Sequence, residues 1–312
     1  MSVLEVNDLR VAISQTQILR GVSFDLQAGQ TLGVVGESGC GKSMTGHALM
    51  GMVPAPGVVT GSIRLAGREL MSLRERDWQQ IRGSEIAVVM QDPFSSLNPV
   101  MRVGHQIAEV YELHRGMGRT EARKAAVTML ERVGVPEPEK SARKFPHQMS
   151  GGQRQRVVIA CAFACQPKVL IADEPTTALD VSLQAQILQL LKRLQEENGT
   201  AVLLISHDIG VIAEVSQRMA VFYAGRVVEQ GVTGEVLTNP RHPYTRALLA
   251  SVPRVGAHRL ESIPGQPPAF NAMPMGCAYA PRCPLRAEQC EQDPALESDG
   301  SGHRVACWRP NG

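Results

Sequence analysis

Residues 31–43 read TLGVVGESGCGKS, and this stretch decides the fold. Its apolar beginning is typical of a buried strand, and GESGCGKS at 36–43 matches the phosphate-loop pattern G-x-x-x-x-G-K-S. The residues that follow, KSMTGHALMGM, have helical character. A strand, a glycine-rich loop and a helix in this order predict a loop that holds nucleotide phosphates, whereas an ordinary glycine turn needs no such flanks.

In such a loop, the glycines let backbone N–H groups close around phosphate oxygens. Lys42 is then expected to reach the β- and γ-phosphates, and Ser43 to offer its hydroxyl to Mg²⁺. The residues predicted to bind ATP are Gly36, Glu37, Ser38, Gly39, Cys40, Gly41, Lys42, Ser43 and Met44.

Two later apolar runs, VLIADE (169–174) and AVLLISHD (201–208), also end in polar residues. Between them, SLQAQILQLLKRLQEENG places leucines and an isoleucine at helical intervals, and Gly199 closes the helix. Strand, helix and strand predict an α/β sheet with polar chemistry at the carboxyl ends of its strands.

The polar residues at these ends are candidates for catalysis. Asp173 is placed to hold Mg²⁺ through water, and Glu174 to polarise the water that attacks the γ-phosphate. His207 is placed to contact the γ-phosphate, and Gln91, after the strand-like IAVVM, to bind Mg²⁺ and the attacking water. Taken singly, solvated acids, a capping histidine and a surface glutamine explain these positions as well.

A second anion-binding feature is MSGGQRQR at 149–156, where a serine and two glycines precede a helical run. The start of a helix carries partial positive charge and exposed N–H groups. The residues concerned are Ser150, Gly151, Gly152 and Gln153. An N-capped helix with Ser150 as the cap is a simpler interpretation, compatible with the first.

Composition sets outer limits on the function. The chain has 312 residues, 43% of them hydrophobic, and a formal net charge of +2, with no long basic run to indicate a nucleic-acid partner. No apolar run approaches the ~18 residues needed to span a bilayer, and the first residues lack a signal-peptide pattern. These features predict a soluble, cytosolic protein able to dock onto a membrane protein.

The motifs together resemble the ATP-binding subunits of ABC transporters over about residues 3–235. The phosphate loop, Gln91, SGGQ, VLIADE, the loop residues Ala178, Leu179 and Asp180, and His207 occur in that family's order and spacing. The resemblance implies a P-loop NTPase fold of the α/β class: a RecA-like core with an antiparallel β subdomain, and a helical subdomain. The expected limits are 1–235 for the ATPase domain, with the helical subdomain at about 92–160.

The resemblance also implies why two anion-binding features exist. In this family, the SGGQ helix start of one subunit caps the ATP held by the phosphate loop of the other, so two ATP molecules join a head-to-tail dimer. The position that commonly stacks an aromatic ring on adenine holds Ile13 here, which leaves an aliphatic contact.

QDPFSSLNP (91–99) and NPRHPYTRALLASVP (239–253) narrow the resemblance to importers of dipeptides, oligopeptides and nickel. It implies ATP-driven peptide uptake at the cytoplasmic face of the inner membrane. The implied partners are a second ATPase subunit, identical or paralogous, two permeases and an extracytoplasmic solute-binding protein. The segment from Phe94 to Val100 and the helical stretch 105–133 are expected to receive a permease helix.

Three alternatives remain at this point. The same machinery could import nickel or another small solute. A soluble ABC ATPase of DNA repair or translation usually carries two cassettes or a long insertion, and this chain has one cassette with a short insertion. A sensor that binds ATP without turnover is opposed by Glu174 and His207.

Residues 236–312 are rich in proline and hold four of the seven cysteines: Cys277, Cys283, Cys290 and Cys307. This stretch is expected to be a small, loop-rich C-terminal extension. In a reducing cytosol, four clustered thiols suggest a metal more than disulfides, and they suit a [4Fe–4S] cluster or structural Zn²⁺. Zinc modules use tighter pairs, and unligated cysteines remain an alternative; the resemblance implies the [4Fe–4S] cluster.

Overall fold

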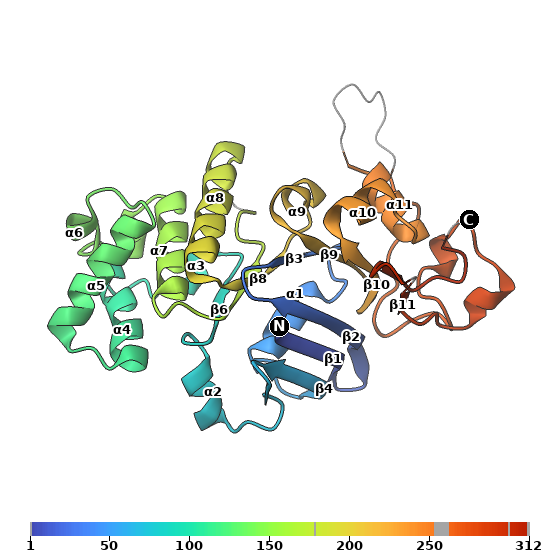
Figure 1. The fold of residues 1–312 in the computed structure, drawn as a ribbon, viewed down its shortest axis with the longest axis horizontal. Coiled ribbons are helices and arrows are strands. Elements are labelled where there is room, and N and C mark those ends of the chain that lie inside the picture. Colours follow the sequence, from blue (N-terminus) through green and yellow to red (C-terminus); the bar gives the residue numbers. More distant parts are fainter. Residues whose placement is uncertain (1, 178, 253–261, 299, 311–312) are drawn as a thin grey trace. The chain divides into compact units, whose positions relative to one another are not determined.

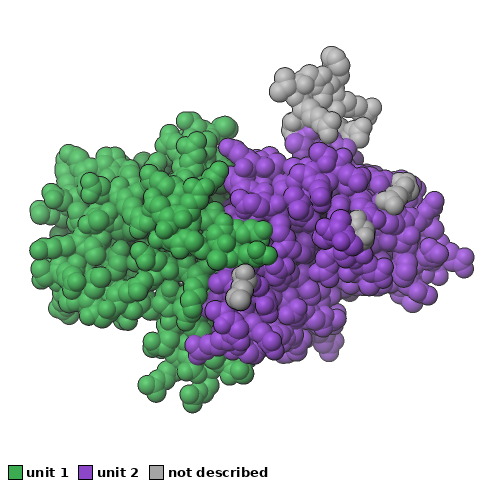
Figure 2. Space-filling model, in the orientation of Figure 1, with its two compact units in different colours: residues 1, 27–30, 72–203 green, residues 2–26, 31–71, 204–312 purple. Residues whose placement is uncertain are grey.

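The computed structural model describes residues 2–177, 179–252, 262–298 and 300–310 (Figure 1). The chain divides into two compact units (Figure 2). Unit 1 is built from residues 72–203 with 27–30, and unit 2 from residues 2–26, 31–71 and 204–312. Unit 2 therefore combines the beginning of the chain with its end.

The first sheet of unit 2 has the strand order β2-β1-β4-β5, and β1 pairs antiparallel with β4. Side chains of β1 alternate between buried and exposed, but the alternation slips by one residue at an irregularity between Asn7 and Arg10. The backbone there passes through a positive φ of 48° at Asp8, as at a β-bulge. The strands are β1 (Ser2–Ile13), β2 (Thr16–Gln27), β4 (Gly57–Leu65) and β5 (Arg68–Glu69).

A second sheet carries the phosphate loop. In unit 2 its strands follow the order β11-β12-β10-β9-β3, with β3 and β9 parallel and β9 and β10 antiparallel. All five residues of β3 are buried, as its apolar sequence predicts. The bounds are β3 (Thr31–Val35), β9 (Arg218–Tyr223), β10 (Arg226–Val232), β11 (Glu297–Ser298) and β12 (Arg304–Val305).

The helices of unit 2 are short. Helix α9 packs on β3 at Gly33, where an added Cβ would lie 2.3 Å from Ile212. Among its described residues, the C-terminal extension includes α11, two 3₁₀ helices and the two-residue strands β11 and β12. The helices are α1 (Lys42–Leu49), α9 (Ile209–Val215), α10 (Thr233–Thr238), α11 (Pro243–Ala250), η2 (Ala280–Arg282) and η3 (Glu288–Glu291).

Unit 1 contains the parallel pair β6 (Ile86–Val89) and β7 (Val169–Asp173). Strand β8 (Ala201–Ile205) contributes residues to both units. The strands and the parallel pairing predicted from the apolar runs are confirmed, and the α/β class with them.

Helices make up most of unit 1. The stretch 105–133 is two helices, α4 and α5, because α4 ends at Gly116 with a positive φ of 64°. Helix α7 contacts α3, α4, α5 and α8. The bounds are α2 (Glu75–Ile81), α3 (Pro93–Ser96), α4 (Val103–Arg115), α5 (Arg119–Arg132), α6 (Pro138–Ser141), η1 (Pro146–Gln148), α7 (Gly151–Phe163) and α8 (Val181–Asn198).

Helix α8 confirms its predicted apolar face. Ile187, Leu190, Leu191 and Leu194 are buried, and Gly199 caps the helix with a φ of 66°. No helix in the described ranges combines the length and the apolar composition needed to cross a lipid bilayer.

Candidate nucleotide-binding site

The phosphate loop connects β3 to α1 in unit 2. Two of its glycines could not easily be replaced, one because there is no room for a side chain and the other because of its backbone conformation. A Cβ at Gly36 would lie 2.3 Å from the Phe222 carbonyl oxygen, and Gly41, the N-cap of α1, has a φ of 103°. The glycine spacing in the sequence therefore has a direct steric cause.

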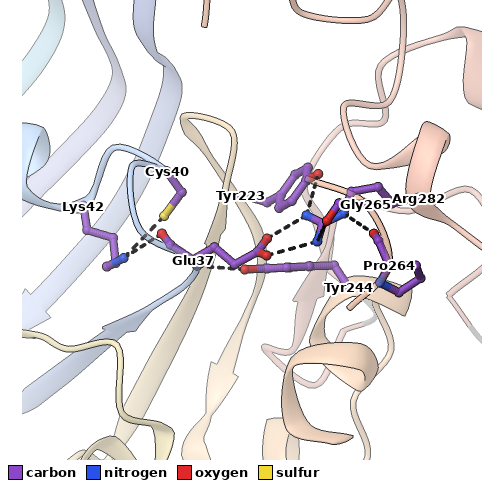
Figure 3. Close-up of polar contacts among 8 residues, drawn as sticks. All are labelled: Glu37, Cys40, Lys42, Tyr223, Tyr244, Pro264, Gly265 and Arg282. Carbon is purple, nitrogen blue, oxygen red and sulfur yellow. Dashed lines mark hydrogen bonds and ion pairs between the residues drawn. The ribbon is translucent and has the colours of Figure 1, made fainter. Parts of the chain in front are cut away.

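The side chain of Lys42 folds back onto the earlier residues of the phosphate loop. Its Nζ donates to the carbonyl oxygen of Glu37 at 2.9 Å (Figure 3) and to that of Gly36 at 2.7 Å. Only 5% of the residue is exposed. It also approaches Cys40 Sγ at 3.7 Å. Burial raises the pKa of the Cys40 thiol, whereas the Lys42 charge lowers it. The carbonyl groups of the loop thus enclose the ammonium group of Lys42.

The loop is also anchored from outside. Gly225 N donates to the Cys40 carbonyl at 2.9 Å, and Glu37 N donates to the Tyr244 hydroxyl at 2.9 Å. The Glu37 carboxylate accepts two hydrogen bonds from Arg282, in the C-terminal extension (Figure 3). Sequence reasoning missed Tyr244 and Arg282, because each is more than two hundred positions from the loop.

His207 belongs to the same unit. The residue before it, Ser206, donates its N–H to the carbonyl of Val34 in β3 at 3.0 Å. His207 is therefore next in the chain to a residue that is hydrogen-bonded to the end of β3. Its side chain is exposed, and Asp208 after it caps α9. Ile13, the candidate adenine contact, ends β1 opposite Gly57 of β4 and is half-buried.

Unit 1 brings Gln91 and the two acids of VLIADE onto neighbouring strands. Val89 of β6 is paired with Ala172 of β7, so Gln91 and Glu174 each lie two residues beyond one register pair. Asp173 is the last residue of β7. The parallel pairing therefore places the amide and both carboxylates at one sheet edge, as predicted.

Glu174 has an unusual backbone. Its φ is +47°, a region that residues with a Cβ rarely occupy, and such conformations collect at functional sites. Its carboxylate accepts a hydrogen bond of 2.9 Å from the Thr177 hydroxyl. Thr177 is a neighbour that sequence reasoning missed.

The SGGQ segment begins α7 with Ser150 as the N-cap. Ser150 Oγ accepts from Gln153 N at 3.3 Å, and Gln153 Oε1 accepts from Ser150 N at 3.2 Å, forming a capping box. The N-cap predicted from the sequence is confirmed.

The two glycines of this segment differ. A Cβ on Gly152 would lie 2.5 Å from Leu183 of α8, whereas a Cβ on Gly151 would meet nothing within 4 Å. Asp180 caps α8 by accepting from Leu183 N at 2.9 Å. Leu183 is the residue that lies against Gly152, so the loop that ends at Asp180 is connected to Gly152 through it. Leu179 is half-buried, and Ala178 lies outside the described residues.

The predicted site residues fall into two sets. Unit 2 holds the phosphate loop, Ile13 and His207, and unit 1 holds Gln91, Asp173, Glu174 and the SGGQ helix start.

The four cysteines of the extension are free thiols. Burial, together with smaller contributions from the nearby Cys290 and Cys307, raises the pKa of Cys277 to about 11. Within the described residues, no three histidine, cysteine or acidic side chains form a group that could hold a metal ion. The structure thus supports neither metal predicted from the sequence.

Comparison with known proteins agrees with this geometry. A family model described as "ABC transporter" matches residues 19–177, and one described as "Oligopeptide/dipeptide transporter, C-terminal region" matches residues 228–290. The oligopeptide transport ATP-binding protein OppD of Salmonella typhimurium is 47% identical, covering 98% of this chain and 93% of its own length. The dipeptide transport ATP-binding protein DppD of Bacillus subtilis is 44% identical, with coverages of 98% and 94%.

Solved structures are similar over the ATPase part. The ATP-binding cassette MJ0796, described as a dimer in a post-hydrolysis state bound to ADP and Pi, is 28% identical with a TM-score of 0.65. The match covers 74% of this chain and 98% of that one. CbiO1 of Clostridium perfringens, part of the transporter complex cbiONQ, has the same identity and TM-score, with coverages of 76% and 91%. The chain therefore belongs to the ABC transporter family, as one of its ATP-binding proteins.

Proposed function

We propose that this protein is the ATP-hydrolysing subunit of an importer of dipeptides or oligopeptides. The observation that carries the proposal is the near full-length similarity to oligopeptide and dipeptide transport ATP-binding proteins, which includes the C-terminal region. The phosphate loop with its enclosed Lys42 supplies the chemistry.

ATP binds with its β- and γ-phosphates on the phosphate loop. Lys42 exchanges its two loop carbonyls for phosphate oxygens, and the N–H groups at the start of α1 face the same charge. Ile13 covers the adenine. Ser43, Gln91 and Asp173 supply hydroxyl, amide and carboxylate oxygens, the donors that Mg²⁺ prefers. When bound, Mg²⁺ neutralises charge that develops on the phosphates.

Glu174 orients and polarises the attacking water, and His207 contacts the γ-phosphate. Two observations support this role for Glu174. Its left-handed backbone sets the carboxylate at the end of β7, and the Thr177 hydroxyl fixes one carboxylate oxygen. A carboxylate held in this way is positioned for general-base work before ATP arrives.

Hydrolysis requires a second ATPase subunit. The open space at Gly151 and the satisfied cap at Ser150 leave the start of α7 ready for a phosphate carried by another chain. Similarity to a cassette whose structure is described as dimeric supports this arrangement. ATP would join two subunits head to tail, and loss of the γ-phosphate contact would loosen them.

The permease is expected to dock beside Gln91. Phe94 and Val100, which follow this glutamine, are large apolar residues left 60% and 83% exposed. Arg154 of α7 lies over the Phe94 ring at 3.4 Å, which ties this surface to the SGGQ helix. Transport at the cytoplasmic face of the membrane, with two permeases and a solute-binding protein, completes the proposed assembly.

A [4Fe–4S] cluster on the four cysteines is a separate part of the proposal. A single ion needs all its ligands around one point, whereas each cysteine of a four-iron cluster binds a different iron atom, so the sulfurs stand farther apart. Cys290 and Cys307 raise the pKa of Cys277, and in turn Cys283 and Cys290 raise the pKa of Cys307. Arg309 N donates to Cys307 Sγ at 3.3 Å. When bound, the cluster would staple the extension.

Iron and labile-sulfide analysis of anaerobically purified protein tests the cluster. We expect about four of each per chain, falling in a Cys283→Ser variant. Absence of iron together with absence of absorbance near about 400 nm would remove this part of the proposal.

Phosphate release by the assembled transporter tests the central activity. Glu174→Gln keeps the size and the hydrogen-bonding oxygen but removes the base, so release should fall about 100-fold or more while ATP still binds. Wild-type rates from Glu174→Gln would overturn the catalytic assignment.

Uptake assays decide the solute. We expect labelled di- or oligopeptides to enter cells in an ATP-dependent manner, and Ni²⁺ not to enter. Uptake of nickel alone would leave the proposed ATPase role unchanged and would show that the transported solute is nickel and not a peptide.

A further inference from the structure

Arg282 of the C-terminal extension makes an unusually complete set of hydrogen bonds. Its Nε donates to the Pro264 carbonyl at 2.8 Å. One terminal nitrogen donates to Glu37 Oε2 at 2.7 Å and to the Tyr223 hydroxyl at 3.2 Å. The other donates to Glu37 Oε1 at 3.0 Å and to the Gly265 carbonyl at 3.4 Å. A guanidinium group has five N–H donors, and every one is used here.

This guanidinium is buried. The Arg282 side chain is 5% exposed, while its partner Glu37 is 24% exposed. A buried charge is tolerated only when it is paired and hydrogen-bonded, and a bidentate arginine–carboxylate pair is among the stronger arrangements. The hydrogen bonds to Glu37 raise the pKa of Arg282.

Aromatic packing holds the pair in place. Tyr223, Tyr244 and Tyr279 are each at most 2% exposed, and their rings lie 4.6–5.4 Å apart. The Arg282 guanidinium carbon is 5.8 Å from the Tyr223 ring centre and 5.9 Å from that of Tyr279. Tyr244 also accepts the Glu37 N–H, so the side chain and the backbone of Glu37 are both held (Figure 3).

Glu37 is the second residue of the phosphate loop, and its carbonyl receives the Lys42 ammonium. Its carboxylate is therefore a negative charge carried by the loop that must receive a triphosphate. Unpaired, it would repel ATP through a partly desolvated medium, where charges interact more strongly than in bulk water. Paired with Arg282, it is neutralised and held away from the loop interior.

We infer that Arg282 is a positioning residue of the nucleotide site, through which the C-terminal extension fixes the phosphate loop and neutralises Glu37. The inference rests on the proposed ATP site at this loop. It gives residues 262–310 a part in ATP binding, beyond the similarity of this region to peptide-transport proteins.

Binding of Mg–ATP to the full chain, by titration calorimetry at fixed salt, tests the inference. Arg282→Gln should raise the Kd about tenfold, which is about 1.4 kcal/mol. Arg282→Lys, which keeps the charge but loses the bidentate fork, should give a smaller increase. Arg246→Gln is the matched control, because Arg246 donates to the carbonyls of Pro240 and Pro310, both outside the loop. The Kd of this variant should equal that of wild type.

Second-site rescue separates this role from simple support of the fold. Glu37→Gln removes the repelling charge, so Glu37→Gln/Arg282→Gln should bind within about threefold of Glu37→Gln alone. A wild-type Kd in Arg282→Gln would overturn the inference. A double variant as weak as Arg282→Gln would also overturn it, since unfolding of the extension would not be rescued by a change in the loop.

Lys42→Ala distinguishes this failure from failure of the site itself. If Lys42→Ala binds Mg–ATP as wild type does, the proposed nucleotide site is wrong. If Lys42→Ala loses binding and Arg282→Gln does not, only the role of Arg282 is wrong.

Discussion

The phosphate loop and the start of α7 are both predicted to bind anions, but they differ in how many parts of the chain hold them. In the phosphate loop, Lys42 is bonded to two carbonyls, and Tyr244 and Arg282 hold Glu37 from the far end of the chain. At the start of α7, Ser150 and Gln153 form a local cap, and a Cβ added at Gly151 would meet nothing within 4 Å. The first feature is held by distant parts of its own chain, and the second leaves open space in which we propose that a second chain places its ATP.

The largest effect is expected from removing the cation of the phosphate loop. Lys42→Ala should raise the Kd for Mg–ATP by about 100-fold or more, because a buried ammonium contacting phosphate oxygens is worth more than one exposed pair. Calorimetry measures this, with thermal unfolding as the check on folding. A loss of less than about fivefold would mean that the loop is not the phosphate site.

The glycine pair at α7 should separate packing from binding. Gly152→Ala forces a methyl group against Leu183 and should lower the free energy of unfolding by about 1–3 kcal/mol. Gly151→Ala has free space, so its unfolding should match wild type while ATP-dependent subunit association weakens. Chemical denaturation and light scattering with ATP in a Glu174→Gln background measure the two effects. Equal loss of stability in both variants would contradict the contrast.

The stability of α11, which contains Tyr244, is expected to depend on pH through its N-cap residue His242. Burial lowers the pKa of His242 to about 3, and its Nδ1 caps α11 by accepting from Tyr244 N. Between an unfolded pKa of about 6.5 and this value, only the unfolded chain binds the proton. Stability therefore falls as pH drops from about 6.5, with a slope of up to about 1.4 kcal/mol per pH unit.

His242→Asn keeps a side chain that can cap the helix but does not titrate, so it should flatten this slope. His105→Asn, at an exposed position, should leave the slope as in wild type. Denaturant unfolding at pH 7, 6 and 5 compares the three proteins. An unchanged slope in His242→Asn would show that this histidine binds its proton equally well in the folded and the unfolded chain.

The smallest effect concerns the neighbour of Glu174. Thr177→Val removes the hydroxyl that bonds the carboxylate and should lower kcat about three- to tenfold, within the range of one hydrogen bond to a charged group. The KM for ATP should stay unchanged. A raised KM with an unchanged kcat would place Thr177 in binding instead of in positioning the base.

The parts of the site that the sequence predicted are those with local causes. The glycine spacing arises from the crowding at Gly36, and the serine–glutamine spacing arises from the capping box at Ser150. The apolar runs arise from the burial of β3 and β7. The left-handed backbone of Glu174 has no such signature, because glutamate gives no hint of a positive φ.

Contacts between distant segments could not be predicted. Arg282 and Glu37 are 245 positions apart, and no sequence pattern near either residue predicts their contact. The pairing of β1 with β4 and the meeting of the first and last segments in unit 2 have the same character. Local sequence identifies each anion-binding piece, whereas the fold decides what holds it.

In the proposed assembly, two polypeptides enclose each ATP. A structure of the Glu174→Gln transporter assembled with Mg–ATP tests this directly. We expect the ATP on Lys42 to be contacted by the second ATPase subunit, and Ser150 and Gly151 to contact the ATP held by that subunit. An ATP contacted by one chain alone, with the start of α7 facing solvent, would contradict the account.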